Sequence, residues 1–72
     1  MDNMPPQPKP LSHAAKVRLK HEMQSHLREA GFQADLIAGW VADGMPVQEF
    51  NLNLYRESKA EAKRLHQLIT EG

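Results

Sequence analysis

Two histidines and a glutamate in the first third of the chain are residue types that bind zinc. His21 and Glu22 are followed by His26, which resembles the zinc-binding pattern HExxH except that the second histidine comes one residue late. Because five residues turn an α-helix by about 500°, the imidazoles of His21 and His26 point about 140° apart. A regular helix cannot bring both onto one ion, so the sequence predicts no metal site.

The other residue types that perform catalysis lack the arrangement that catalysis requires. The chain has no cysteine, which excludes thiolate nucleophiles, thiolate metal ligands and disulfides. Ser12, Ser25 and Ser58 have no nucleophile-elbow glycines around them. No pair of carboxylates lies in an apolar setting suited to general acid and base catalysis. We therefore expect neither an enzyme nor a bound cofactor.

Basic residues gather on the outer face of the first expected helix. Nine Lys and Arg balance nine Asp and Glu in the whole chain, and this balance argues against a generic polyanion binder. Residues 9–30 nevertheless carry five Lys or Arg against two Glu, while residues 31–53 have no Lys or Arg. The face predicted to bind an acidic partner consists of His13, Lys16, Lys20 and Arg28. A merely solvated face is the simplest alternative.

A DNA- or RNA-binding regulator is the alternative function for the same face. Two short helices joined by a tight turn resemble a helix-turn-helix. However, the helix expected after Gly44 has no Lys or Arg before Arg56, whereas recognition helices usually present basic or amide side chains to bases. Binding to another protein is therefore preferred to binding a nucleic acid.

The elements that would position these residues are three helices in an all-α domain. Ser12 suits an N-cap, and Gly31 suits the C′ position after a first helix over residues 12–30. A short second helix is expected over residues 33–43. Gly44 would end it, and Pro46 would lie in the first turn of a third helix over residues 46–70.

The apolar residues of these helices predict a small core and a self-association surface. The residues assigned to the core are Leu19, Met23, Leu27, Phe32, Leu36, Ile37, Trp40, Val41, Val47, Phe50 and Leu54. The third helix would be the longest, so its far end would lack an intrachain partner. A homodimer is therefore predicted, with a self-association surface of Leu52, Tyr55, Leu65, Leu68 and Ile69.

The ends and length of the chain complete the expected domain organisation. Prolines at positions 5, 6, 8 and 10 favour extended backbone, so residues 1–10 are predicted to be a disordered arm before a helical domain over residues 11–72. No stretch approaches the ~20 apolar residues of a membrane span, and there is no apolar signal segment. We expect a cytoplasmic protein that has no membrane partner.

One segment also resembles a known protein family. Residues 30–54 include Ala30-Gly31-Phe32, Leu36-Ile37-Ala38, Val41-Ala42-Asp43-Gly44-Met45 and Glu49-Phe50. This run is similar to a helical segment of tailed-phage head-maturation protease and scaffold proteins, although the protease domain is absent. The resemblance implies a phage or prophage origin, a bacterial host cytoplasm and no proteolysis. The predicted function is a dimeric assembly factor, or a stoichiometric inhibitor or regulator of a host protein.

Overall fold

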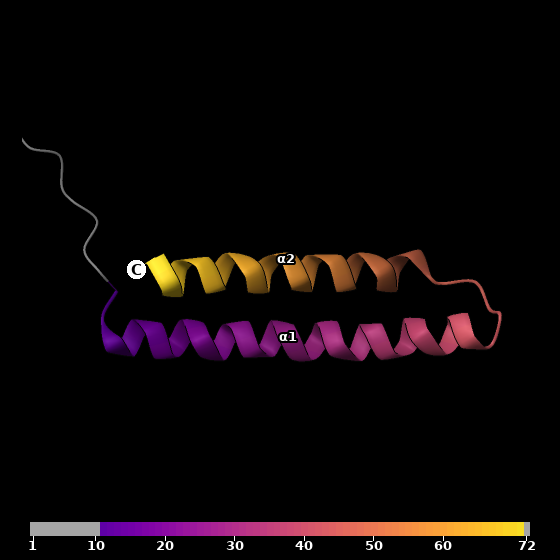
Figure 1. Ribbon diagram of the computed structural model, residues 1–72, viewed down its shortest axis with the longest axis horizontal. Helices are drawn as coiled ribbons and strands as arrows, with labels where there is room; N and C mark the ends of the chain where they lie inside the picture. Colours follow the sequence, from indigo (N-terminus) through magenta and orange to yellow (C-terminus); the bar gives the residue numbers. More distant parts are fainter. Residues whose placement is uncertain (1–10, 72) are drawn as a thin grey trace, which may run out of the picture.

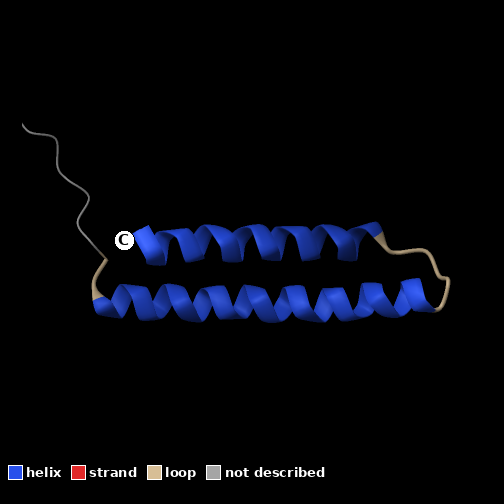
Figure 2. Ribbon diagram, viewed as in Figure 1, coloured by secondary structure: helices blue, strands red, loops and turns tan. Residues whose placement is uncertain are grey.

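A computed structural model describes residues 11–71 as a helical hairpin (Figure 1). Helix α1 spans His13–Ala42 and helix α2 spans Glu49–Glu71. The two helices lie side by side and antiparallel, joined by one loop at the far end of the molecule (Figure 2). The all-α prediction is confirmed, but the described residues form two helices, not the three expected. The predicted arm of residues 1–10 lies outside the described residues.

The beginning of α1 follows the capping chemistry expected from the sequence. Ser12 has extended backbone, and its hydroxyl accepts a hydrogen bond from the Ala15 amide at 3.1 Å. This bond satisfies one of the free amides of the first turn. Ser12 as the N-cap is therefore confirmed.

The expected break at Gly31 is wrong, because α1 continues through it as one helix of 30 residues. A glycine at C′ ends a helix by adopting a positive φ, and the only glycine with positive φ among the described residues is Gly44. Gly31 instead lies between Ala30 and Gln33, which are both buried. The packing of α1 against α2 at this point outweighs glycine's weak helix propensity, a cost of about 1 kcal/mol.

The predicted stop at Gly44 is confirmed. Gly44 has φ 68°, and its amide bonds the Val41 carbonyl at 3.2 Å, while the Met45 amide bonds the Trp40 carbonyl at 2.8 Å. These two bonds form a Schellman motif, which satisfies carbonyls left free at the end of a helix.

Helix α2 begins three residues later than expected, at Glu49 and not at Pro46. The Gln48 carbonyl accepts the first helical bonds, from the amides of Asn51 and Leu52, both at 3.1 Å. Pro46 lies in the connecting loop. The helical conformation is disfavoured for a residue that precedes proline, so Met45 and Pro46 suit a loop between two antiparallel helices.

The contact between α1 and α2 has the spacing of a coiled coil. Its residues are buried or half-buried and recur alternately three and four positions apart. On α1 they are Leu19, Met23, His26, Ala30, Gln33, Ile37 and Trp40, and on α2 Asn51, Tyr55, Ser58, Ala62, Leu65 and Ile69. This spacing keeps one stripe of each helix facing the other, and it runs through Gly31 without interruption.

Candidate functional site

The interior of the hairpin consists mainly of small and polar side chains. Among the described residues, the buried ones are Ala30, Gln33, Ser58, Ala62 and Leu65. Only Leu65, at 1% exposure, is a large apolar residue. Alanine and serine let two helices approach closely, but they contribute little apolar area. The hairpin therefore buries a thin seam and no large hydrophobic core.

A chain of hydrogen bonds fixes the register of the two helices within this seam. The Gln33 side chain, which is 3% exposed, donates from Nε2 to Glu29 Oε1 at 3.1 Å. Its Oε1 accepts from Asn51 Nδ2 across the helix contact at 2.8 Å. Because this polar pair is satisfied only when Gln33 lies opposite Asn51, a slip of either helix would leave buried polar atoms without partners.

Several large apolar residues lie outside the seam, contrary to their assignment to the core. Leu27 is 50% exposed, Phe32 59%, Val41 64% and Phe50 71%. The other assigned core residues are only half-buried, namely Leu19, Met23, Leu36, Ile37, Trp40, Val47 and Leu54. Two helices cover only one stripe of each other, so the apolar faces expected to meet inside a three-helix domain remain partly uncovered.

The apolar side chains near the loop form a group that we call the loop-end cluster. Phe32, Leu36 and Trp40 recur every four residues along α1, so they share one side of that helix. Phe50 and Leu54 have the same relation on α2, and Val47 precedes them in the loop. Because Gln33 lies opposite Asn51, these two strips lie at the same level of the hairpin. The cluster consists of Phe32, Leu36, Trp40, Val47, Phe50 and Leu54.

The predicted self-association surface has a different environment from the one expected. Helix α2, with 23 residues, is shorter than α1, with 30, so the reasoning from an overhanging last helix was wrong. Leu65 is buried against α1 at 1% exposure, while Leu68 is 41% exposed. Leu52, Tyr55 and Ile69 are half-buried. Of the five residues, Leu68 is the most accessible to a second chain.

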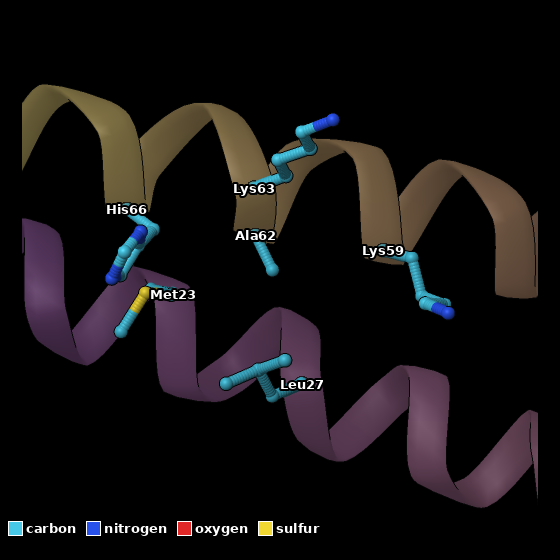
Figure 3. Close-up of a pocket in the computed structure, with 6 residues that line it drawn as sticks. All are labelled: Met23, Leu27, Lys59, Ala62, Lys63 and His66. Carbon is cyan, nitrogen blue, oxygen red and sulfur yellow. The ribbon is translucent and has the colours of Figure 1, made fainter.

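A groove runs along one side of the hairpin, between the two helices. It has a volume of about 280 Å³ and is lined by Met23 and Leu27 of α1 and by four residues of α2, Lys59, Ala62, Lys63 and His66. Figure 3 shows Ala62 directed toward α1 between His66 and Lys59, Lys63 extending away from α1, and the imidazole of His66 beside the thioether of Met23. The groove thus has an apolar floor and a cationic rim.

The basic residues predicted from the sequence continue beside this groove. Lys20 lies seven residues before Leu27, two helical turns away on the same strip of α1, and Lys16 lies one turn further. On α2, Arg56 lies seven residues before Lys63. Helical spacing therefore places Lys16, Lys20, Arg56, Lys59, Lys63 and His66 on one side of the hairpin, which we call the cationic flank. Exposed His13 and Arg28 extend it along α1, with Arg28 turned furthest from α2.

The opposite side of the hairpin carries carboxylates. Glu22, Glu29 and Leu36 form one strip with a spacing of seven on α1, and Leu54, Glu61 and Leu68 form another on α2. Arg64 donates to Glu61, with Nε at 2.9 Å from Oε1. This hydrogen bond, reinforced by the charge of Arg64, lowers the pKa of Glu61. We call this side the acidic flank.

Only the α1 half of the cationic flank, with Lys16 and Lys20, is predicted from the sequence. The α2 half depends on the pairing of the two helices and consists of Arg56, Lys59, Lys63 and His66. Within α2 a spacing signal was present, since residues 56, 59, 63 and 66 recur at intervals of three and four. What the sequence could not show is that this strip faces the same way as Leu27.

The two histidines considered for zinc binding have different environments. His26 is half-buried in the helix contact, and His21 is exposed. Within residues 11–71, no three His, Asp or Glu side chains come together in an arrangement that could hold a metal ion. Neither α1 nor α2 includes a stretch with the length and hydropathy of a membrane-spanning helix.

Comparisons with known proteins return no relatives for this chain. No protein-family model, no curated protein and no solved structure matches it. The resemblance to phage head-maturation proteins stays a prediction.

Proposed function

We propose that this chain is a small, non-enzymatic protein-binding module that forms a homodimer through its loop-end cluster. The supporting observation is the contrast between Phe50 and Phe32, at 71% and 59% exposure, and a seam whose only large buried side chain is Leu65. A chain of this size rarely gains enough stability from its own core. Pairing two hairpins would cover the exposed aromatic residues with apolar surface.

The distribution of charge favours pairing at the loop ends. Glu22, Glu29 and Glu61 lie on the same side as the loop-end cluster but toward the open end of the hairpin. In a two-fold dimer centred on Leu36 and Leu54, the clusters meet while the carboxylates of each chain extend past its partner. A fully buried aromatic side chain covers ~150–250 Å², so the exposed parts of Phe32 and Phe50, 59% and 71% of their surfaces, supply part of the ~800 Å² per partner of a standard interface.

The biological role that we propose is a phage-encoded assembly factor, or a stoichiometric inhibitor or regulator of a host protein, in the cytoplasm of a bacterial host. The basis for the phage origin is the resemblance of residues 30–54 to a helical segment of tailed-phage head-maturation proteins. A DNA- or RNA-binding regulator is the second candidate. It is favoured by one observation, the five Lys and Arg of the cationic flank, which could contact phosphates.

Sedimentation equilibrium of the whole chain tests the dimer. The wild-type protein should have twice the chain mass of 8.2 kDa, and its thermal midpoint should rise with protein concentration because dimerisation is linked to folding. Phe32→Asp and Phe50→Asp should each give a monomer or a strongly weakened dimer. Val17→Asp is the matched control, since Val17 is a 40% exposed apolar residue of α1 outside the cluster.

A wild-type protein that remains a helical monomer, with a thermal midpoint independent of concentration, would overturn the dimer. Equal loss of self-association in Val17→Asp and Phe50→Asp would move the interface away from the loop end. The concentration dependence is measured on the wild-type chain, so the test stands even where a variant fails to fold.

A further inference from the structure

The groove and the cationic flank form one continuous surface that the proposed dimer leaves uncovered. The groove opens between Met23 and Leu27 on one helix and Ala62 on the other. Leu27 at its edge is 50% exposed. The loop-end cluster lies on the opposite side of the hairpin, so pairing through that cluster leaves this groove facing outward.

We infer that this surface is a docking site for an acidic amphipathic helix of a partner protein. The inference deepens the proposed protein-binding function by naming the site and the chemistry of the partner, and it does not depend on the dimer. The partner helix would lay a row of apolar side chains along the groove, with its carboxylates on both sides of that row.

The shape of the groove suits a helix. Met23 and Leu27 are four residues apart, so they form one ridge about 6 Å long on α1. Side chains at i, i+3 and i+7 of an incoming helix pack into the depression between such a ridge and a neighbouring helix. Ala62 keeps the floor of the groove low, which gives a large side chain of the partner room to enter.

The charge of the rim specifies an acidic partner. Lys59 and Lys63 lie on the α2 edge of the groove, and Lys20 lies on the α1 side. The carboxylate that helical spacing places on this flank is Glu49, which lies at the loop end of α2, ten residues before Lys59 and away from the groove. The salt bridge of the described residues is Arg64–Glu61, on the acidic flank, so these lysines carry uncompensated charge. Lys59 is exposed, and its ammonium lies 5.2 Å from the centroid of the Tyr55 ring.

The apolar floor favours a protein helix over a nucleic acid. A phosphate backbone is bound by cations and amides and gains nothing from Met23 and Leu27. An amphipathic helix uses both parts of the surface at once, since its apolar row covers the floor while its carboxylates meet the lysines. Cations at the rim of an apolar groove also raise the rate of association with acidic partners.

Binding of a synthetic helical peptide tests this inference. The probe is a fluorescently labelled peptide of ~18 residues with leucines at helical spacing i, i+3 and i+7, flanked by glutamates. We expect saturable binding by fluorescence anisotropy that weakens as salt concentration rises. Three comparison probes are the peptide with lysine for glutamate, a scrambled peptide of the same composition, and a DNA duplex of equal charge. Each should bind at least about tenfold more weakly.

Variants of the groove locate the binding. Leu27→Asp and the double variant Lys59→Glu/Lys63→Glu should each weaken peptide binding at least about tenfold. Arg18→Glu/Arg64→Glu is the matched control, because it reverses two charges outside the groove and should leave binding unchanged. Circular dichroism verifies helix content, and the exposure of Leu27 and the lysines makes these changes compatible with folding.

Four results would overturn the inference. They are equal binding of the scrambled peptide, tighter binding of the duplex, equal loss in the Arg18/Arg64 control, and loss of self-association in place of peptide binding in the Lys59/Lys63 variant. The last result would assign the groove to a second copy of the chain. Peptide binding that persists in monomeric Phe50→Asp would support the docking site while separating it from the dimer.

Discussion

The inside and the outside of the hairpin near its loop have opposite chemistry. Inside, the buried residues at this level are Ala30 and Gln33, whereas outside Phe32 and Phe50 are more than half exposed. A self-sufficient domain places its large apolar residues inside and its polar ones outside. The reversal indicates that the contact between α1 and α2 serves mainly to set distance and register, while the large apolar residues are available to a further chain.

The largest expected effect comes from the one place where the inside is apolar. Leu65→Ala should lower the free energy of unfolding by about 2–5 kcal/mol, because it removes the only large side chain that is fully buried within residues 11–71 and leaves a cavity. Urea unfolding followed by circular dichroism measures the change. Leu68→Ala, at a leucine of α2 that is 41% exposed, should cost much less. Equal losses of unfolding free energy in the two variants would mean that buried and exposed leucines contribute equally to stability.

The polar part of the seam should contribute specificity more than stability. Gln33→Leu should cost about 1–3 kcal/mol, because Asn51 then loses its partner in a partly buried setting. The double variant Gln33→Leu/Asn51→Leu should recover most of this loss and no longer fix one register. Unfolding free energies and the number of amide resonances in NMR spectra test both parts. A double variant less stable than Gln33→Leu would contradict this role for the polar pair.

Alanine substitutions at two glycines distinguish the effect of backbone conformation on stability from the effect of packing. Gly44→Ala should destabilise the hairpin by about 1–2 kcal/mol, because Gly44 has φ 68° and L-residues are strained there. Gly31→Ala should stabilise it by about 0.5–1 kcal/mol, because Gly31 is helical and an added Cβ would meet nothing within 4 Å. Thermal unfolding of both variants gives the signs. Destabilisation by Gly31→Ala would indicate that α1 needs flexibility at this point.

The same two glycines show what the sequence could predict about the fold. The stop at Gly44 could be predicted because the preference of glycine for positive φ is a local property, whereas Pro46 was wrongly expected in the first turn of a helix that begins at Glu49. Gly31 was misread because its propensity is also local, while α1 is held straight by contacts with α2 that are distant in sequence. The seven-residue spacing that links Leu19, His26 and Gln33 continues through Gly31 and was the available signal. An overall charge balance of zero also hid the separation into two flanks, which appears only once Gln33 and Asn51 set the register.

The smallest expected effect concerns the ion pair on the acidic flank. Arg64 holds the pKa of Glu61 below its ordinary value of 4.5, mainly by hydrogen bonding to its carboxylate. A carboxylate whose pKa is lowered in the folded state stabilises the fold above the unfolded-state pKa, and this contribution is lost as pH falls through the folded-state pKa. Arg64→Gln should therefore lower stability slightly near neutral pH, and the difference from wild type should begin to shrink near pH 4.5 and vanish once the pH is below the lowered pKa of Glu61.

The effect should be small because both side chains are in contact with water, which screens the pair. Lys63→Gln is the matched control, since Lys63 is an exposed cation of α2 on the cationic flank, one residue from Arg64, with no carboxylate three or four residues away on its helix. Thermal midpoints measured from neutral pH to below pH 4.5 should show a pH-dependent difference from wild type for Arg64→Gln alone. The same dependence in Lys63→Gln would mean that the two flanks are not electrostatically distinct, and that the charge assigned to the groove is compensated from across the helix.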